Sequence, residues 1–517
     1  DAYFTITFLD NFEFRSSFGL DLERNQFRSF TPEFEVSPTQ RNEDSNVNVE
    51  AEFLTNWLWE NTVTYQEDFG DHGLTVLGGI TAQEQQFEDL GGSRINVPGS
   101  DKNLWYLSAG QEEGQLNFNS ASENSYYSYL ARVNYQYKDR YLFTGSYRID
   151  GSSRFTDENR WGYFPSVALG WVASEESFME NLNEISFLKF RASYGVIGND
   201  KIGAYPTFVT VTANQLAVFG PDQSLNNGAT ITQIVNRDQI WEETEQLDIG
   251  MELNLFENKL QTEIDYYRRD TNGILVPVPI PFYTGVFNEP VVNAAEVRND
   301  GFDFNISWRE SRGEWGYSIG LVASTVNNEV LALGEGNEEI LAGGLINEIG
   351  ATTRTVVGGE IGAFWGYEAI GVFQTEQEIA NSPTRGGEQP GDLIYKDQNG
   401  DGVINTDDRV EIGSPIADWI FGVNLDFNYR GFDLSMSFDG QAGHDIFNAK
   451  RAVRFGVENF ETSRLDRWTG PGTSNTEPRV TNAGHNYLPS THFLEDGDFL
   501  RLRNLQVGYT IPVTFAN

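Results

Sequence analysis

Hydrophobic and polar residues alternate strictly over four neighbouring stretches between Tyr126 and Val196. In the first stretch, one face carries Tyr127, Tyr129, Ala131, Val133, Tyr135 and Tyr137. The residues between them are mostly small or polar, and the pattern restarts at Tyr141, Trp161 and Leu188. A period of two residues predicts β-strands with one aromatic, apolar face and one polar face. Such strands are typical of a transmembrane β-barrel, which faces lipid outside and water inside.

The same alternation recurs along the whole chain, and short and long connections follow one another in turn. Short turns are predicted at 9–11, 68–73, 138–140, 256–259, 309–314 and 430–431. The segment 174–187 belongs to the same side, with one helical turn at Ser177–Leu182. Long loops are predicted near 26–50, 87–122, 198–240, 276–290, 326–417 and 444–492. Because outer-membrane barrels keep their short turns in the periplasm, the predicted fold is an all-β, antiparallel transmembrane β-barrel with long extracellular loops.

Strand direction bears on how the chain is divided into domains. The strand that begins at Trp315 runs outward and the one that begins at Trp419 runs inward, so 326–417 is predicted to be one extracellular excursion. The alternation gives about fifteen crossings, whereas a bacterial barrel has an even number. We therefore expect residues 1–517 to be a partial β-barrel domain. A slip of phase between Leu502 and Leu505 predicts a β-bulge in the last strand.

Composition excludes several classes of protein. The chain of 517 residues has a net charge of −41, which argues against nucleic-acid binding. It has no Cys and only four His, so it has no disulfide framework and few candidates for His-based chemistry. No nucleophile elbow, HExxH motif or phosphate-binding loop is present, and we expect no enzyme.

Several stretches resemble segments of one protein family. They are Asp150–Phe155 with Asn159–Ser166, Leu188–Gly195 with Gly198 and Asn199, Asn299–Asp303, Gly391–Asp397 through Gly402, Arg467–Thr469, and Asp496–Leu502 with Leu505, Gly508, Tyr509 and Pro512. The family that they resemble is that of the SusC-like (SusC/RagA) TonB-dependent outer-membrane transporters. These segments follow the order of the family over nearly the whole chain.

The resemblance implies a 22-stranded barrel in the outer membrane of a Gram-negative bacterium, filled by an N-terminal plug. It also implies a SusD-like surface lipoprotein partner, energy from the TonB complex, and import of oligosaccharides or peptides. The chain contains no segment that resembles the plug or the TonB-contacting region, and we expect the plug and the last strands to be absent from it.

Two other functions fit parts of the sequence. A passive outer-membrane porin would have an open lumen and no plug. A calcium-dependent, soluble β-rich adhesin or binding protein would have polar outward faces, and the aromatic outward faces argue against it.

One loop has the spacing of a calcium site. Ca²⁺ prefers six to eight oxygen ligands, and a twelve-residue loop supplies them at fixed positions. The predicted ligands are Asp397, Asn399, Asp401, Val403 through its carbonyl, Asn405 and Asp408. Gly402 allows the sharp turn, and Ile404 is the expected apolar anchor. The calcium ion would stiffen the long loop, while the alternative is an Asp/Asn/Gly turn without metal.

Candidates for substrate contact are weaker. Arg148, Asp150 and Arg154 are predicted to meet ligand at the mouth of the lumen, although a network of ion pairs at the rim is the alternative. Loop aromatics could stack on sugar rings, with loop packing or lipoprotein contact as the alternative. These aromatics are Trp365, Trp105, Tyr106, Phe282, Tyr283 and Phe287.

Overall fold

The computed structural model describes the chain except residues 39, 203–206, 210, 232–233, 278–289, 335–337, 344–349, 454–460, 482–483 and 512–517. The chain divides into two compact units. The first comprises residues 1–169, 195–243 and 279–292, and the second 170–194, 244–278 and 293–517. Within the described part of the chain, no helix combines the length and the hydropathy needed to cross a membrane.

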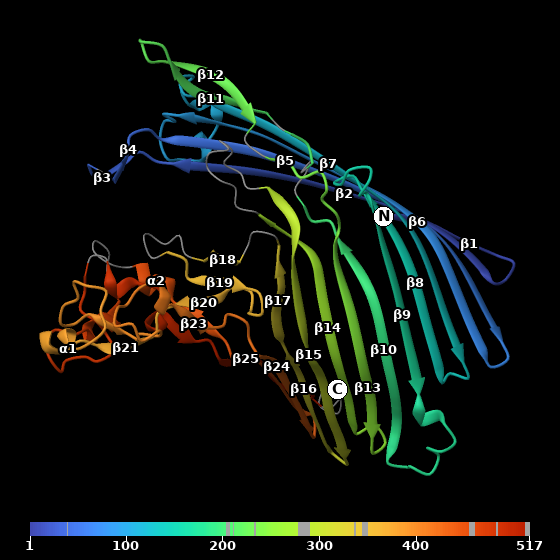
Figure 1. Cartoon of the computed structure of the whole chain (residues 1–517). Coiled ribbons are helices and arrows are strands. Elements are labelled where there is room, and N and C mark those ends of the chain that lie inside the picture. The colour runs from blue at the N-terminus through green and yellow to red at the C-terminus, as the bar shows by residue number, and fades with distance from the viewer. Residues whose placement is uncertain are drawn as a thin grey trace. The chain divides into compact units, whose positions relative to one another are not determined.

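Long antiparallel strands build the first unit. Their hydrogen-bonded order is β1 (Ala2–Phe8), β2 (Phe12–Thr31), β5 (Asn46–Phe69), β6 (His72–Ile95), β7 (Leu116–Tyr137), β8 (Tyr141–Ser152) and β9 (Trp161–Val172). Figure 1 shows β5, β6 and β7 running side by side over their whole length. Two small hairpins also lie in this unit: β3 (Phe34–Ser37) with β4 (Gln40–Asn42), and β11 (Val211–Phe219) with β12 (Ser224–Ile231).

A second run of antiparallel strands lies mainly in the second unit. Its order is β10 (Ile185–Asn199), β13 (Glu242–Leu255), β14 (Leu260–Pro277), β15 (Val291–Arg312), β16 (Trp315–Thr325), β24 (Trp419–Tyr429), β25 (Phe432–Ala442) and β28 (Phe499–Tyr509). The strand β17 (Asn327–Leu333) pairs with the start of β15. In the described part of the chain the two runs hold seven and eight strands, which we call the wall strands, and their sum agrees with the predicted count of about fifteen.

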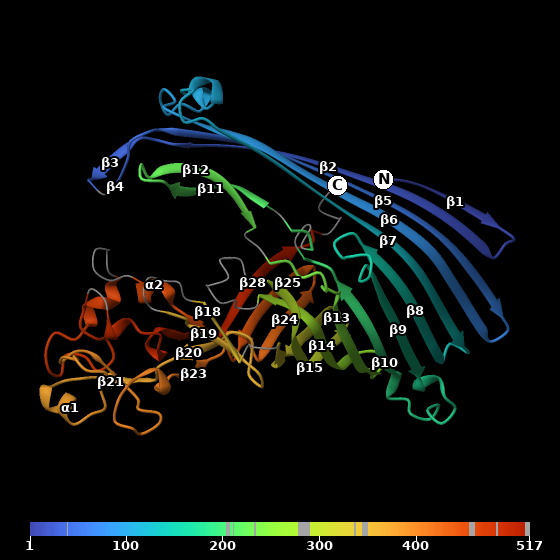
Figure 2. The same cartoon turned by 45° about the horizontal axis from the view of Figure 1, so that its top comes forward.

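The second unit also contains a group of short elements, which we call the loop region (residues 339–413 and 445–496, apart from those outside the described part). It consists of β18 (Glu339–Ala342), β19 (Thr353–Val356), β20 (Ala363–Gly366), β21 (Ala369–Val372), α1 (Glu376–Ala380), β22 (Leu393–Tyr395), β23 (Val410–Gly413), β26 (Asp445–Phe447), α2 (Ala449–Val453) and β27 (Leu494–Asp496). Figures 1 and 2 both show most of these elements gathered together. In its described residues, the predicted excursion 326–417 thus forms small sheets and contains no wall strand, while β17 pairs with β15.

The predicted short turns are confirmed, and some are tighter than expected. The strands β5 and β6 are joined by two residues, as are β15 and β16. In the turn between β24 and β25, Arg430 and Gly431 both have positive φ, at 48° and 84°. Positive φ at both central residues matches the right-handed twist of a two-residue hairpin.

Some predicted loops were wrong in extent. The structure continues β2 to Thr31, starts β5 at Asn46, continues β6 to Ile95 and starts β7 at Leu116. Polar residues or glycine interrupt both faces in the extensions of β2, β6 and β7, so the hydropathy signal ends there while the backbone ladder continues, whereas Val47 and Val49 keep the alternation at the start of β5. The hairpin β11–β12 lies within the predicted loop 198–240. The predicted helical turn at Ser177–Leu182 was also wrong, because a 3₁₀ turn at Ala173–Glu175 comes first and simple turns follow.

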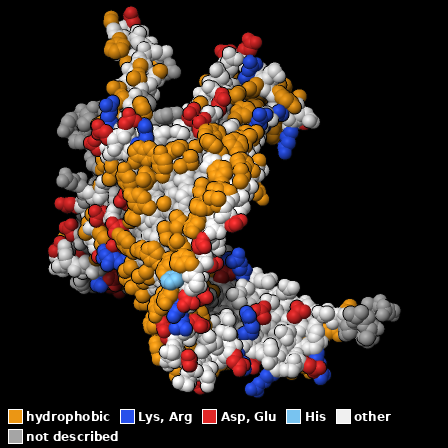
Figure 3. All heavy atoms as spheres, turned by 90° about the vertical axis from the view of Figure 1, so that its right-hand side faces the viewer, with side chains coloured by type: hydrophobic (Ala, Val, Ile, Leu, Met, Phe, Trp, Pro, Cys, Tyr) orange, Lys and Arg blue, Asp and Glu red, His pale blue; other side chains and the backbone are white. Residues whose placement is uncertain are grey.

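The faces of the wall strands divide as the alternation predicts. Aromatic residues on one face of the first unit are exposed, among them Tyr129, Tyr147 and Tyr163. Figure 3 shows hydrophobic side chains gathered over a broad area of the molecular surface. The predicted β-bulge is present: Ser437 pairs with Asn504 and Phe438 with Leu502, which leaves Arg503 as the extra residue.

Candidate functional site

The polar face of three wall strands in the second unit, β10, β13 and β14, carries a cluster of charged side chains. Arg191 of β10 lies at its centre, and its Nη1 is 2.9 Å from Oε1 of Glu252 on β13. Arg191 also pairs with Asp265 on β14, through Nε at 2.9 Å and Nη2 at 2.6 Å, and with Glu263. Lys189 Nζ lies 2.9 Å from the same Glu252 oxygen. Two cations and three carboxylates are therefore held together across three neighbouring strands.

A glycine makes room for this cluster. A Cβ atom at Gly250 would lie 1.8 Å from Asp265 Oδ1 and 2.7 Å from Arg191 Nε. Both distances are far below van der Waals contact, so any side chain at this position would have to displace Asp265 and Arg191. Alternation along 247–255 and 260–266 places Gly250, Glu252, Glu263 and Asp265 on the polar faces of their strands, but it cannot bring them together, since strand register is not visible in the pattern.

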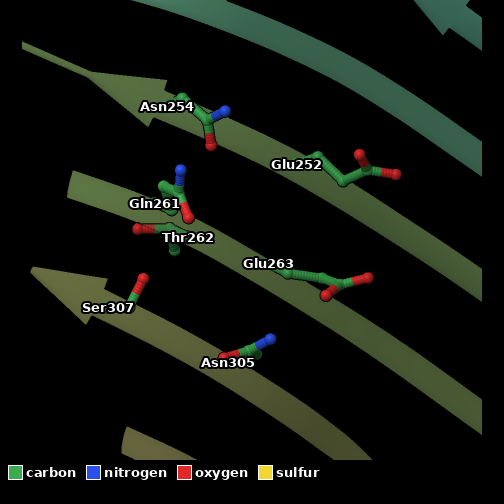
Figure 4. Close-up of a pocket in the computed structure, with 7 residues that line it drawn as sticks. All are labelled: Glu252, Asn254, Gln261, Thr262, Glu263, Asn305 and Ser307. Carbon is green, nitrogen blue, oxygen red and sulfur yellow. The ribbon is translucent and has the colours of Figure 1, made fainter. Parts of the chain in front are cut away.

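A shallow polar hollow of about 220 Å³ adjoins this cluster. It is lined by Glu252, Asn254, Gln261, Thr262, Glu263, Asn305 and Ser307. Figure 4 shows that these side chains come from the three neighbouring strands β13, β14 and β15. Every lining side chain offers an oxygen or nitrogen atom, so the hollow suits a hydrated polar molecule rather than an apolar one.

The structure separates the three residues predicted at the mouth. Arg148 Nε donates to both carboxylate oxygens of Asp150, at 2.7 and 2.8 Å, and Arg148 Nη2 donates to Ser128 Oγ at 3.1 Å. Arg154 instead donates to the carbonyl oxygen of Ile202 and lies 3.8 Å from Asp200. Arg148 and Asp150 thus form one pair, while Arg154 belongs to another cluster.

That second cluster fixes a loop and was missed by the sequence analysis. Ser152 is fully buried and donates from Oγ to Asp200 Oδ2 at 2.6 Å. The ring of buried Trp241 packs on Phe155 and Phe164, with 5.1 and 5.4 Å between the ring centroids. Arg154 stands beside a packed aromatic core, and its contacts within the described chain are those of a structural residue. Asp200 and Trp241 lie too far along the sequence for alternation to reveal them.

The predicted aromatic platforms make contacts of their own. Arg354 lies over the Trp365 ring at 4.2 Å, and Arg409 lies 5.9 Å from the same ring. Trp105 stacks on Phe30 at 5.4 Å. Likewise Arg28 covers Tyr106 at 4.5 Å. The remaining predicted platforms, Phe282, Tyr283 and Phe287, lie outside the described residues.

The predicted calcium loop folds into a tight series of turns. The Asp397 carboxylate accepts hydrogen bonds from the backbone amides of Gly400 and Gly402, at 2.7 and 2.9 Å. These bonds, that from Gly402 foremost, lower the pKa of Asp397 below its usual value. Asp408 is fully buried and accepts from the amides of Gln398 and Asn405, each at 2.8 Å.

The other predicted ligands also face the backbone of the loop. Asn399 Oδ1 accepts from the Asp401 amide at 2.9 Å, and Asp401 Oδ1 accepts from the Val403 amide at 2.8 Å. Ile404 is buried in the core of the loop region, as an apolar anchor should be. Across the described ranges, no three Asp, Glu, His or Cys side chains are grouped closely enough to hold a metal ion. Calcium binding stays a prediction.

Comparison with known proteins gives consistent results. The sequence model of the family described as "TonB dependent receptor-like, beta-barrel" matches residues 1–516. The TonB-dependent receptor P3 of Formosa agariphila is 33% identical over 527 residues, which cover 99% of this chain and 51% of that protein. The TonB-dependent receptor SusC of Bacteroides thetaiotaomicron is 29% identical over 402 residues, which cover 75% of this chain and 38% of that protein.

A solved structure has the same fold. The RagAB peptide transporter contains a chain that superimposes with a TM-score of 0.83 at 24% identity, covering all of this chain and 55% of that one. The chain described here thus spans about half the length of the relatives it matches.

Proposed function

The chain belongs to the TonB-dependent receptor-like β-barrel family. From this membership we propose that it forms part of the barrel wall of an outer-membrane importer for oligosaccharides or peptides. The family is one of outer-membrane transporters and receptors. The observation that supports the proposal is the polar face around Arg191, which adjoins a hollow lined entirely by polar side chains. In a barrel, that face lines the lumen. Hydroxyl, amide and carboxylate groups there would bind hydrated sugars or peptides alike.

We also propose the partners that the family resemblance implies. These are a SusD-like surface lipoprotein outside the cell and the TonB complex in the periplasm. The similarity to SusC and the shared fold with a chain of the RagAB peptide transporter support this assignment. The two relatives leave both substrate classes open.

The experiment is an uptake assay with cells that carry the full-length transporter. Labelled oligosaccharides and labelled peptides are supplied separately, with and without an agent that collapses the proton-motive force. Energy-dependent uptake of one class is expected, together with loss of uptake when the surface lipoprotein is deleted. Uptake that persists in de-energised cells would identify a passive pore instead.

We further propose that residues 397–408 hold a structural calcium ion. The spacing of oxygen-bearing residues and the buried anchor Ile404 support the proposal. Hydrogen–deuterium exchange of this loop is measured in millimolar calcium and in excess chelator, where calcium should slow exchange. Asp401→Ala should remove that protection, whereas Asp407→Ala, which changes a residue outside the predicted ligand set, should keep it. Identical exchange with and without calcium would show that the loop is a metal-free turn.

A further inference from the structure

The connection between β9 and β10 is longer than the described short turns that join other consecutive wall strands. Those turns contain two to four residues, whereas this connection, 173–184, contains twelve. In outer-membrane barrels the short connections lie on the periplasmic side. Figure 1 shows the connection extending beyond the end of β10. Twelve residues are far more than a hairpin needs, and here they form a defined structure.

The backbone of this connection forms consecutive turns. The amide of Glu176 donates to Ala173 O at 3.1 Å, and the amide of Met179 donates to Glu176 O at 2.9 Å. The amide of Leu182 then donates to Met179 O, and that of Ile185 to Leu182 O, each at 2.9 Å. Hydrogen bonds at every third residue hold the side chains of the segment in fixed directions.

Two large apolar side chains of the segment are exposed at the surface of the protein. Phe178 is 64% exposed and Leu182 is 48% exposed. The ring centroids of Phe178 and Trp171 are 6.5 Å apart. Trp171 in turn stacks on Phe190 of β10, with 5.9 Å between the ring centroids. The chain of rings therefore connects Phe178 with the outward, apolar face of the wall strands.

Trp171 and the acidic residues of the segment indicate where it lies relative to the boundary between lipid and water. The indole Nε1 of Trp171 donates to Glu176 Oε1 at 3.3 Å, so its polar edge meets the segment while its ring continues the apolar face. Tryptophan rings of this kind lie at the boundary between lipid and water. Glu180 and Glu184 are exposed and can remain in water while Phe178 and Leu182 enter an apolar phase.

We propose that residues 173–184 are a membrane-interface anchor whose Phe178 and Leu182 insert among phospholipids of the periplasmic leaflet. The continuity with the lipid-facing surface through Trp171 selects lipid over a protein partner. The proposal rests on the outer-membrane barrel alone, so it stands whichever substrate is imported. The anchor would fix the height of β9 and β10 in the membrane and resist tilting of this part of the wall.

The test uses nitroxide labels on the full-length transporter in phospholipid nanodiscs. The 517 residues contain no cysteine, so Phe178→Cys and Leu182→Cys each add a single thiol to this part of the protein. Glu180→Cys is the matched control in the same segment. Folding of each variant is checked by the shift in gel mobility between unheated and heated samples. Relaxation by oxygen reports contact with lipid, and relaxation by a soluble nickel chelate reports contact with water.

Labels at 178 and 182 should relax several-fold more with oxygen than with the nickel chelate, and the label at 180 should show the reverse. Equal access of nickel at all three positions would place the segment in water and overturn the proposal. Protection of 178 and 182 from both reagents would reveal a protein partner and overturn it as well.

Discussion

The wall strands and the loop region place their apolar side chains in opposite ways. On the wall strands of the second unit, Ile249, Ile319 and Phe432 are each about half exposed, and the hydrogen-bonded ladder between strands holds the structure. In the loop region, a set of apolar side chains that includes Phe373, Leu393 and Phe493 is fully buried, while others such as Leu465 are exposed. One set therefore requires a surrounding lipid, whereas the other excludes water by itself.

The loop region contains two small cores made of residues distant in the sequence. The first consists of Tyr367, Val372, Leu393, Tyr395 and Ile404. The second consists of Ala452, Tyr487 and Phe493. Since the loop region has few long ladders of its own, its order should depend on these cores more than the wall strands depend on any single side chain.

Phe493→Ala should have the largest effect and should act on the loop region alone. Phe493 is fully buried, and deleting such a ring costs about 3–5 kcal/mol. Hydrogen–deuterium exchange in lipid should therefore rise across 445–453 and 485–496 while the wall strands remain protected. Phe432→Ala removes the same ring from an exposed position on β25 and is the control. Equal loss of protection in both variants would contradict the division between the two regions.

Ile319→Arg should destabilise the wall strands, as Phe493→Ala destabilises the loop region. Ile319 lies on the outward face of β16, and an arginine facing the middle of the bilayer costs about 2–4 kcal/mol. Urea unfolding in lipid vesicles, followed by tryptophan fluorescence, measures this loss.

Gly320→Arg changes the next residue and points to the opposite, polar face, where the nearest atom to a new Cβ is 3.9 Å away. It should unfold close to the unmodified protein. If both arginines cost the same, the assignment of the two faces is wrong.

A buried histidine should make the loop region, but not the wall, sensitive to mild acid. Burial, together with the charges of Arg451 and Arg464, lowers the pKa of His492 from 6.5 to about 3. Below pH 6.5 the unfolded chain takes up a proton that the folded chain refuses, so stability falls as the pH falls and is constant above pH 6.5. The slope is about 1.4 kcal/mol per pH unit.

Exchange of the loop region, corrected for the intrinsic effect of pH, would measure this slope between pH 7 and about pH 5. His492→Gln removes this titrating ring and should reduce the slope, and the remaining slope is expected from His485, because burial lowers the pKa of that ring too. An unchanged slope would assign the acid sensitivity to groups other than His492.

The same division explains how much of the molecule was visible in the sequence. The turn at Lys138–Arg140 and the bulge at Arg503 could be predicted because each interrupts a local period of two residues. The Arg191 cluster could not, since joining β10 to β13 and β14 requires knowledge of register. The cores around Leu393 and Phe493 show no period at all, because their members come from separate turns and short strands.

The smallest predicted effect tests whether the polar face of the wall is packed as closely as a core. Gly250→Ala would drive a methyl group into the Arg191–Asp265 pair, and overpacking typically costs about 1–3 kcal/mol. Part of this is offset, since alanine in a strand is favoured over glycine by about 0.5–1 kcal/mol, which leaves a net loss near 1 kcal/mol. Gly320→Ala adds the same methyl group where the nearest atom is 3.9 Å away and should cause no loss. Urea unfolding of both variants in vesicles gives the difference directly. If Gly250→Ala is as stable as Gly320→Ala, the ion-pair cluster yields easily and the polar face behaves as a solvated surface rather than a packed one.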